Sequence, residues 1–554
     1  MQRQMWLLAA ACLLFQAVDR VATAFPDPEL IGYWPLATDG QDHSGHGRHA
    51  VVKGAVQFNA IGPAGEKTSA ITLDGASGFL EIPTAADWSL GTQDFSVSLW
   101  MRPDETAQGA GDLISQYDVR RQRGFLLGIK TQSVTTSVAN AGHLQFGIDS
   151  GVASEWTDCG RPGDALLAFA LTVHRGSLYA GTCEPGAAQS GRVYRYGGGQ
   201  EWVDCGAPDK SNSVTSLAVH RGELYAGTGK YRVAGSALTE SENTNLGGRI
   251  FRYAGDRQWI DCGALPNTEA IGGLVVFRGE LYASSLYRPA GFYRYDGQTG
   301  WIDCGTPDGK RVVALGVYHG QLYATSYDGG RVYRYDGSTW TDCGLLGDNT
   351  QTYSFATYFG RWYVGTWPSG KVYRFEDVDR WTDVGRLGDE LEVMGMLVHN
   401  GRLLAGTLPL AEVYAYDGEA TWKKLMRLDH TPDVKYRRAW TMAEHDGRVY
   451  CSTLPSGRIY AFQAGHSIDH GHPLTPGWRH VAAVRAGNTL TMYVDGQVVS
   501  ESAAADEKPL DLRVDTPLRI GFGANDYFHG SLSEVRLYGA ALTSEHVRTL
   551  AQPR

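Results

Sequence analysis

Short runs in which apolar and polar residues alternate recur along most of this 554-residue chain and predict a protein built almost entirely of β-strands. Between residues 151 and 466 the runs form a repeating unit, seen most clearly from Val312 to Gly344. Each unit has four strand-like runs, a His-Gly or Arg-Gly turn, an Asp-Gly turn and a closing tryptophan. The tryptophans of successive units are Trp156, Trp202, Trp259, Trp301, Trp340, Trp381 and Trp422. Four strands per unit, at a period of about 40 to 57 residues, predict the radial array of sheets called a β-propeller.

The two ends of the repeat region predict how the ring closes. The region opens with a lone fourth strand, Glu155 to Gly160, and finishes on a third strand, Arg458 to Phe462. Pairing of these two segments would complete the last sheet and leave no free sheet edge. The expected result is a seven-bladed propeller with its entry and exit side by side, as insertion into another domain requires.

The segments on either side of the ring alternate as well but lack the repeat. Phe95 to Trp100 and Leu490 to Val494 have the pattern of half-buried strands, and Asp495-Gly496 predicts a hairpin turn. Neither segment has enough strands to bury the face of a sandwich alone. We therefore expect residues 25–150 and 467–554 to fold together as one discontinuous β-sandwich, with the propeller at 151–466.

Six motifs in the flanking segments occur in the order of a known family. Before the ring stand "LIGYWPLATDGQDHSGHGRHA", "AITLDGASGFLEIP" and "FSVSLWMRP", and after it "GWRHVAAVRAGNTLTMYVDGQVV", "PLRIGFGAN" and "FHGSLSEVRLYGAALTSEHV". Together they resemble a laminin-G-like, concanavalin A-like jelly roll. The resemblance covers nearly all of both segments. It implies a domain that binds carbohydrate or another ligand.

The same resemblance implies a structural calcium ion, which many members of the family hold. Asp42 and Glu534 match positions where the family has oxygen ligands. The family usually has an aspartate where this chain has Ser533. The alternative is that Asp42 caps a turn and Glu534 is solvated.

The repeats resemble kelch and Asp-box, sialidase-type propellers, for example in Tyr335-Asp336-Gly337 followed by Trp340. The kelch Gly-Gly pair is missing and the Asp-box spacing is compressed, so the resemblance concerns shape and not activity. We expect each repeated tryptophan to fill the wedge between blades and each repeated aspartate to cap a turn. Histidines recur at one turn of the repeat, which also suits a scaffold: His174, His220, His319, His399 and His445.

The N-terminal segment and the net charge indicate where the protein is located and which partners are unexpected. Residues 1–24 have the charged start, apolar stretch and small-residue end of a signal peptide, which predicts an exported protein, secreted or periplasmic. No later segment reaches the length of a membrane span. A net charge of −10 makes nucleic acid an unexpected partner.

The cysteines do not predict a disulfide framework. Five of them occupy one position in successive repeats, where the strands are too far apart for a bridge, and we expect buried free thiols: Cys159, Cys205, Cys262, Cys304 and Cys343. A bridge between Cys183 and Cys451, on the first and last blades, stays open.

Candidate binding residues lie in loops of varied length on one face of the ring, opposite a face of short, uniform turns. These loops collect basic and aromatic side chains: Lys230, Tyr231, Arg232, Tyr287, Arg288, Lys310, Arg311, Tyr327, Tyr353, Trp367, Arg437, Arg438 and Trp440. Arginine can grip carboxylate or sulfate while aromatic rings stack on sugars. We expect an extracellular glycan ligand, with an anionic polysaccharide as the sharper hypothesis; scattered solvated charges are the alternative.

Two other functions stay open. A polysaccharide lyase or glycoside hydrolase could have its active site at the mouth of the ring, although no paired carboxylates, nucleophile with a base, or metal motif supports catalysis. Protein–protein adhesion through the ring is the third possibility.

Overall fold

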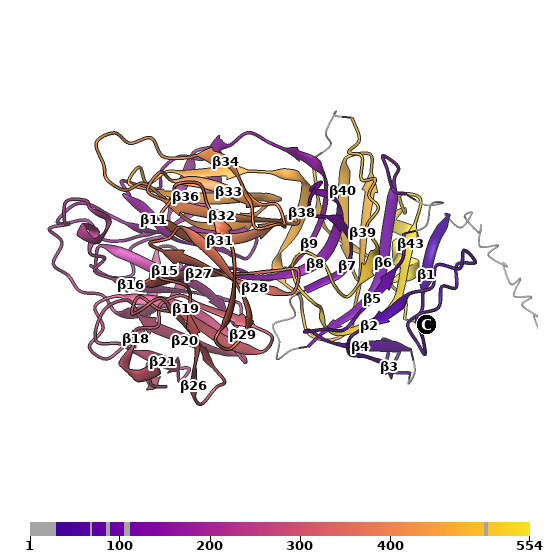
Figure 1. Ribbon diagram of the computed structural model, residues 1–554, viewed down its shortest axis with the longest axis horizontal. Helices are drawn as coiled ribbons and strands as arrows, with labels where there is room; N and C mark the ends of the chain where they lie inside the picture. The colour runs from indigo at the N-terminus through magenta and orange to yellow at the C-terminus, as the bar shows by residue number, and fades with distance from the viewer. Residues whose placement is uncertain (1–28, 67–68, 85–88, 105–110, 504–507, 554) are drawn as a thin grey trace, which may run out of the picture.

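The structure is a computed structural model that describes residues 29–66, 69–84, 89–104, 111–503 and 508–553. The predicted signal peptide lies outside these residues. A sandwich of two β-sheets and a ring of smaller sheets lie side by side along the long axis (Figure 1). The predicted all-β class is confirmed, and no helix in the described ranges is long and apolar enough to cross a membrane.

The sandwich is a jelly roll whose two sheets draw strands from both flanks of the ring. In chain order its elements are β1 Leu30–Trp34, β2 Val51–Lys53, β3 Val56–Ala60, β4 Ala70–Asp74, β5 Phe79–Ile82, β6 Phe95–Pro103, β7 Gly111–Asp118, β8 Arg123–Val134, β9 Ser137–Ala153, β38 Ala464–Pro473, β39 Arg479–Ala486, β40 Thr489–Val494, β41 Gln497–Glu501, β42 Leu518–Ile520, β43 His529–Tyr538 and helix α1 Ser544–Leu550. One sheet has the order β3-β4-β43-β6-β39-β40-β41, with β1 beside β43; the other has the order β2-β5-β42-β7-β8-β9-β38.

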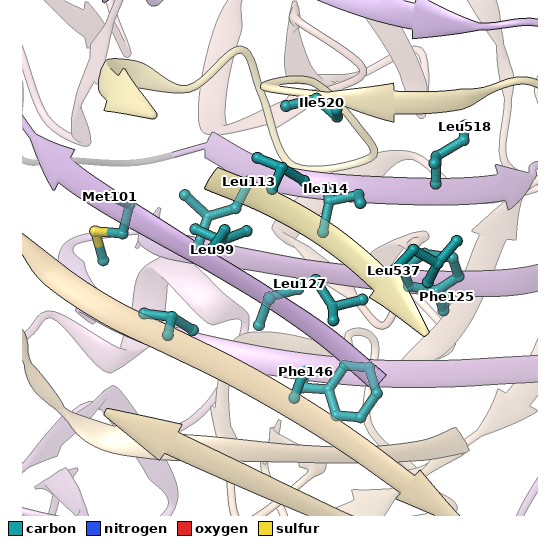
Figure 2. Close-up of a cluster of buried hydrophobic side chains, with 14 of the residues drawn as sticks. Leu99, Met101, Leu113, Ile114, Phe125, Leu127, Phe146, Leu518, Ile520 and Leu537 are labelled. Carbon is teal, nitrogen blue, oxygen red and sulfur yellow. The ribbon is translucent and has the colours of Figure 1, made fainter. Parts of the chain in front are cut away.

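Strands from before and after the ring alternate in both sheets, so neither flank makes a sheet alone. β43 lies between β4 and β6, and β42 lies between β5 and β7. Their inward side chains form one apolar core between the two sheets (Figure 2). Phe125 and Phe146 on one sheet meet Leu99 and Leu537 on the other, and all four are almost fully buried. Removal of apolar surface from water on both faces holds the two flanks together.

The ring consists of four-stranded antiparallel units. Its strands are β10 Thr157–Asp158, β11 Leu167–His174, β12 Ser177–Cys183, β13 Val193–Gly198, β14 Glu201–Asp204, β15 Ser213–His220, β16 Glu223–Gly229, β17 Arg249–Gly255, β18 Gln258–Ala264, β19 Ile271–Phe277, β20 Glu280–Ser285, β21 Phe292–Tyr295, β22 Trp301–Asp303, β23 Leu315–Tyr318, β24 Gln321–Thr325, β25 Arg331–Tyr335, β26 Trp340–Leu345, β27 Gln351–Tyr358, β28 Arg361–Trp367, β29 Lys371–Asp377, β30 Arg380–Arg386, β31 Glu392–His399, β32 Arg402–Leu408, β33 Glu412–Tyr416, β34 Trp422–Arg427, β35 Arg438–His445, β36 Arg448–Leu454 and β37 Ile459–Phe462, with short 3-10 turns η1 Val233–Ser236 and η2 Pro307–Gly309.

Five of the ring's sheets are separate and four-stranded, and β11 to β18 make one eight-stranded sheet. That larger sheet is two four-stranded meanders joined by a single residue pair, Cys183 with Ser213. The last sheet has the order β10-β37-β36-β35, in which Thr157 pairs with Ala461 and Asp158 with Tyr460. The first strand of the repeat region therefore completes the last sheet.

The repeated tryptophans link neighbouring units around the rim. Six of them donate the indole N–H to a backbone carbonyl on the outer strand of the preceding unit, at 2.8–3.1 Å: Trp202, Trp259, Trp301, Trp340, Trp381 and Trp422. Trp156 stacks on Phe462 instead, with ring centroids 4.9 Å apart. The repeated aspartate caps the turn that follows, as Asp204 does by accepting the Gly206 N–H at 2.7 Å. Both residue types have the structural roles expected of them.

The cysteines of the described residues are all free thiols, including Cys183 and Cys451. Four of the five repeated cysteines are buried as expected, but Cys304 is half-exposed. The bridge left open by the sequence is not formed.

The hairpin of β8 and β9 extends beyond the sandwich into the centre of the ring. β9 contacts β11, β15, β19 and β35, while β8 contacts β23, β27, β31 and β35, so the hairpin touches the first strand of every four-stranded unit. Its tip donates from Thr136 Oγ1 to the Thr215 carbonyl at 2.6 Å and accepts from the Leu274 N–H at 3.1 Å. Residues that the sequence assigned to the sandwich thus fill the axis of the ring.

The predicted boundaries at residues 150 and 466 fall inside or beside continuous strands. β9 runs on to Ala153 and β38 begins at Ala464, and these two residues pair with each other. The chain passes between sandwich and ring along this strand pair, which has no separate linker. The structure differs from the predicted boundaries because β9 and β38 stay paired up to the ring, which keeps their backbone groups hydrogen-bonded.

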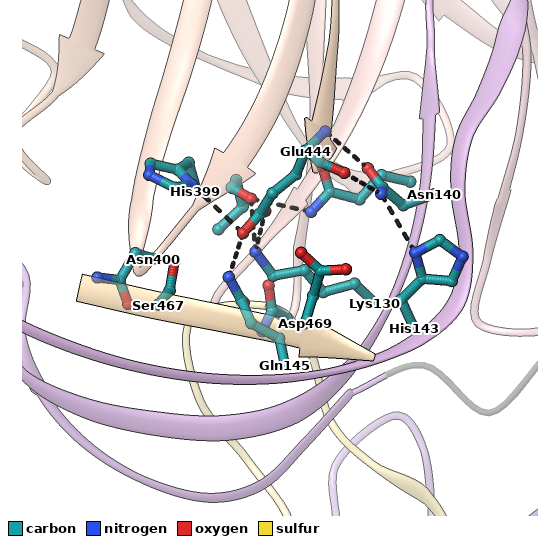
Figure 3. Close-up of polar contacts among 12 residues, drawn as sticks. Lys130, Asn140, His143, Gln145, His399, Asn400, Glu444, Ser467 and Asp469 are labelled. Carbon is teal, nitrogen blue, oxygen red and sulfur yellow. Dashed lines mark hydrogen bonds and ion pairs between the residues drawn. The ribbon is translucent and has the colours of Figure 1, made fainter. Parts of the chain in front are cut away.

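A buried charge cluster joins hairpin and ring where the hairpin enters (Figure 3). Glu444 on β35 accepts from Lys130 Nζ on β8 at 2.5 Å, and both side chains are at most 3% exposed. His399 Nδ1 lies 3.3 Å from the same carboxylate, and Gln145 donates to it as well. Burial raises the pKa of Glu444, but Lys130 and His399 together, through charge and hydrogen bonds, lower it to about 2. The carboxylate is therefore ionised and held by partners from both parts of the protein.

Candidate ligand-binding site at the mouth of the ring

The two faces of the ring have different neighbours. The short turns between first and second strands face the sandwich: Gly176 donates its N–H to the Gly471 carbonyl at 3.0 Å, and Gly447 donates to Asp469 Oδ2 at 3.2 Å. The loops of varied length lie on the opposite face. This face, which we call the mouth, is the one on which the sequence placed the candidate residues.

A cavity of about 390 Å³ occupies the mouth. Seven of the thirteen predicted residues line it: Tyr231, Arg232, Tyr287, Tyr327, Tyr353, Arg438 and Trp440. The rest of its wall is Thr135, Thr136, Phe169, Ala234, Gly235, Glu240, Leu286, Ala314, Gln351 and Met394. Its volume lies within the roughly 300–1,000 Å³ range of small-ligand sites.

Aromatic side chains make up much of the wall. Phe169 on β11 packs edge-to-face on Trp440 of β35, with ring centroids 4.8 Å apart, and Tyr231 lies 5.0 Å from Phe169. Across the cavity Tyr327 and Tyr353 have centroids 5.0 Å apart. The innermost strands of the ring converge here, so residues far apart in the sequence meet around one space.

The sandwich supplies part of this wall. Thr135 and Thr136, at the tip of the β8–β9 hairpin, reach the cavity from the other side of the ring. Thr135 has a φ of 50°, the left-handed conformation that a two-residue hairpin turn requires. Its hydroxyl donates to Thr441 Oγ1 at 3.0 Å, which fixes the tip against β35.

The charged residues of the wall are paired. Arg438 Nε lies 3.1 Å from Glu392 Oε1; these are the first residues of β35 and β31. Burial lowers the pKa of Arg438, but Glu392, Tyr231 and Tyr353 together raise it. Arg232 pairs with Glu269 and lies over the Tyr287 ring at 4.6 Å. The guanidinium groups are therefore already held by carboxylates of the protein.

Two buried donors of the wall residues have no hydrogen-bond partner among the described residues. They are Nη1 of Arg438 and Nε1 of Trp440. A buried donor without a partner costs about 1–3 kcal/mol. Unsatisfied groups of this kind are uncommon in native structures.

The other six predicted residues lie outside the cavity. Arg288 and Arg311 both pair with Asp328, at 3.1 and 2.7 Å. Lys230 donates to the Ser241 carbonyl at 2.7 Å, and Arg437 donates to the Thr431 carbonyl at 2.6 Å. Of the last two predicted residues, Lys310 lies exposed just after η2, and Trp367 is half-buried at the end of β28.

Sequence reasoning missed the wall residues on the inner strands and the hairpin tip. Phe169 and Met394 belong to apolar strand runs that look like ordinary core. For Thr135 and Thr136 the sequence offered one signal, the run of small residues from Ser133 to Ala139. Small side chains fit in a narrow channel such as the axis of the ring.

The tyrosines of the wall are poor candidates for a general base. Burial raises the pKa of Tyr327, and the charge of Glu392 raises it further. Burial likewise raises the pKa of Tyr353 well above its ordinary value. A phenol of raised pKa stays protonated at neutral pH, so it can donate a hydrogen bond but does not abstract a proton readily.

The two predicted calcium ligands lie on either side of Tyr33. The Asp42 carboxylate accepts the N–H groups of Tyr33 and Arg48 at 3.0 and 2.9 Å. Glu534 accepts the Tyr33 hydroxyl at 2.9 Å and pairs with Arg536. No cluster of three or more His, Cys, Asp or Glu side chains suited to a metal occurs in the part of the chain that the structure describes. Turn capping thus accounts for Asp42, and calcium stays a prediction.

Residues 427–548 match the sequence model of the concanavalin A-like lectin/glucanases superfamily. The match begins at the end of β34, includes the sandwich strands that follow the ring and ends within α1. This segment is therefore similar in sequence to concanavalin A-like lectins and glucanases. Curated proteins include none that matches the chain.

Several solved propeller structures are similar to the chain at low identity. Virginiamycin B lyase from Staphylococcus aureus, an inactive variant solved with quinupristin, is 10% identical, with a TM-score of 0.44, covering 56% of this chain and 99% of that one. The WD40 β-propeller domain of Doa1 is 12% identical, with a TM-score of 0.41, covering 56% and 97%. A putative gluconolactonase is 13% identical, with a TM-score of 0.32, covering 57% and 93%. At these scores the similarities say nothing about activity.

Proposed function

We propose that this chain is an exported recognition protein that binds carbohydrate at the mouth of its ring. The observation that carries the proposal is the cavity of about 390 Å³ walled by aromatic rings from separate units. Aromatic faces stack on the apolar faces of sugars, while hydroxyl and amide groups at the edges supply hydrogen bonds. Tyr287, Tyr327 and Tyr353 are only half-buried and offer such faces.

The architecture that we propose for this function has seven blades. It counts the eight-stranded sheet as two blades, because a single residue pair joins its halves. The ring at 151–466 is inserted in a lectin-like sandwich made of 25–150 and 467–554, and residues 1–24 direct export. The similarity of residues 427–548 to the concanavalin A-like lectin/glucanases superfamily supports a carbohydrate ligand.

A glycan array tests the proposal with one wall variant and one matched control. Tyr287→Ala removes a ring that lines the cavity, whereas Tyr460→Ala removes a half-buried tyrosine that does not. We expect wild type and Tyr460→Ala to retain the same glycans and Tyr287→Ala to bind them about 10-fold more weakly, equivalent to about 1.4 kcal/mol. Failure of the wild type to retain any glycan, or equal retention by both variants, would contradict the proposal.

Thermal unfolding with and without calcium tests the predicted metal. If Asp42 and Glu534 hold calcium, chelation lowers the thermal stability of the wild type and leaves Asp42→Asn unchanged. Equal melting temperatures of the wild type in both conditions would remove the metal from the proposal.

A further inference from the structure

We infer that the mouth cavity selects uncharged sugar residues over acidic ones. The inference rests on the proposed function and reverses the anionic preference that the sequence predicts. Its basis is the charge balance of the wall. The three charged residues that line the cavity are Arg232, Glu240 and Arg438.

Each of these three charges has a partner of opposite sign. Arg438 pairs with Glu392 at 3.1 Å, and Glu240 lies 3.4 Å from Lys230. Arg232 pairs with Glu269 at 2.5 Å. The charged residues that line the cavity and their partners are three cations and three carboxylates, so this set has no net charge.

An acidic sugar would need a cation that is not already neutralised. A carboxylate moved out of water loses several kcal/mol of hydration, and only a new ion pair of good geometry offsets that loss. Arg438 can provide such a pair only by sharing its charge with Glu392, which would then repel the incoming carboxylate. Glu240, whose side chain is 41% exposed, adds a second repulsion at the rim of the cavity.

An uncharged sugar avoids both costs. Its hydroxyl oxygens accept hydrogen bonds from neutral and charged donors alike and bring no charge to be desolvated. The protonated hydroxyl of Tyr327, whose pKa burial raises, is a donor of this kind. The Tyr353 hydroxyl donates to Gln351 Oε1, and its oxygen can accept from a sugar hydroxyl. Stacking on the tyrosine rings supplies the remaining attraction.

The test compares tetrasaccharides that differ only in charge, by isothermal titration of the full chain. Glucose, galactose and mannose tetrasaccharides are each paired with the corresponding uronic acid tetrasaccharide. We expect the neutral member to bind at least about 10-fold more tightly. Its affinity should change less than about twofold between 50 and 500 mM NaCl, because no ion pair is formed.

Two loop variants locate the discrimination. Glu240→Gln frees Lys230 and removes the repulsion, so the preference for the neutral member should fall about threefold or more. Glu242→Gln changes an exposed carboxylate of the same loop that does not line the cavity and should leave the preference unchanged. Equal or tighter binding of the uronic acid member by the wild type would overturn the inference and leave carbohydrate binding intact. Binding of neither member of any pair would overturn the proposed function as well.

Discussion

The rim and the axis of the ring differ in whether their contacts repeat from one unit to the next. At the rim, one contact recurs: an indole N–H donates to a carbonyl of the preceding unit at six of seven positions. Along the axis a single hairpin from the sandwich meets a different inner strand on each side, so its contacts do not repeat from unit to unit. The repeated contacts between units form the ring. The contacts that do not repeat attach one end of its axis to the sandwich and leave the other end open.

The two ends of the axis extend this comparison. β31 and β35 carry Glu392 and Arg438 at the mouth, and His399 and Glu444 at the sandwich end. Six residues separate Arg438 from Glu444, or about 20 Å of strand. At the sandwich end the hairpin brings Lys130 and Gln145 to the carboxylate; at the mouth the pair lies beside a cavity. The same two strands therefore attach the hairpin at one end and border the cavity at the other.

The largest effect should come from breaking the charge cluster of the axis. Lys130→Met leaves the buried Glu444 carboxylate without its cation, and we expect a loss of about 3–5 kcal/mol in the free energy of unfolding. Urea denaturation followed by tryptophan fluorescence measures it. Lys130→Met combined with Glu444→Gln removes both charges and should recover a large part of the loss. A loss below about 1 kcal/mol in the single variant would show that the cluster does not hold ring and hairpin together.

Acid should reveal the same cluster in the wild type. A carboxylate whose pKa is lower in the folded state stabilises the fold above its unfolded value and loses that contribution as pH falls through the folded value. For Glu444 this window runs from its ordinary 4.5 down to about 2. We expect the free energy of unfolding to fall by up to about 1.4 kcal/mol per pH unit more steeply in the wild type than in Glu444→Gln. Glu201→Gln, at the exposed rim, should follow the wild type; parallel slopes for all three proteins would contradict the assignment.

A larger side chain on the hairpin inside the ring should reduce the free energy of unfolding by less than the loss of Lys130 does. Ala139 on β9 is fully buried among ring residues, whereas Val152 on the same strand is 58% exposed. Ala139→Leu should therefore destabilise the protein by about 1–3 kcal/mol, and Val152→Leu should leave it unchanged. Thermal unfolding of the two variants provides the measurement. A tolerated leucine at Ala139 would mean that the hairpin does not fill the channel tightly.

The sequence predicts the rim far better than the axis, for a physical reason. Tryptophan, aspartate and glycine at fixed spacing report contacts within one repeat or between adjacent repeats, so Trp202 and Asp204 could be assigned roles from their pattern alone. The loop residues of the mouth could be proposed as a group, and Tyr231, Tyr353 and Trp440 do line one cavity. The hairpin could not be foreseen, because its small residues alternate as in any strand and the ring residues that bond to it lie from 34 to 307 positions away along the chain. The pairing of Arg438 with Glu392 could not be predicted from the sequence either, since it depends on which inner strands become neighbours.

The smallest effect should come from a single rim contact, and the ring contains its own control. Trp202 donates its indole N–H to the Cys159 carbonyl at 2.8 Å, whereas the equivalent atom of Trp156 has no hydrogen-bond partner among the described residues. Phenylalanine preserves most of the apolar ring and deletes the donor. Trp202→Phe should therefore lose about 0.5–1.5 kcal/mol more in the free energy of unfolding than Trp156→Phe, measured by urea denaturation of both. Equal losses would mean that the rim is held by packing of the rings alone, and that the recurring hydrogen bond accompanies the contact without strengthening it.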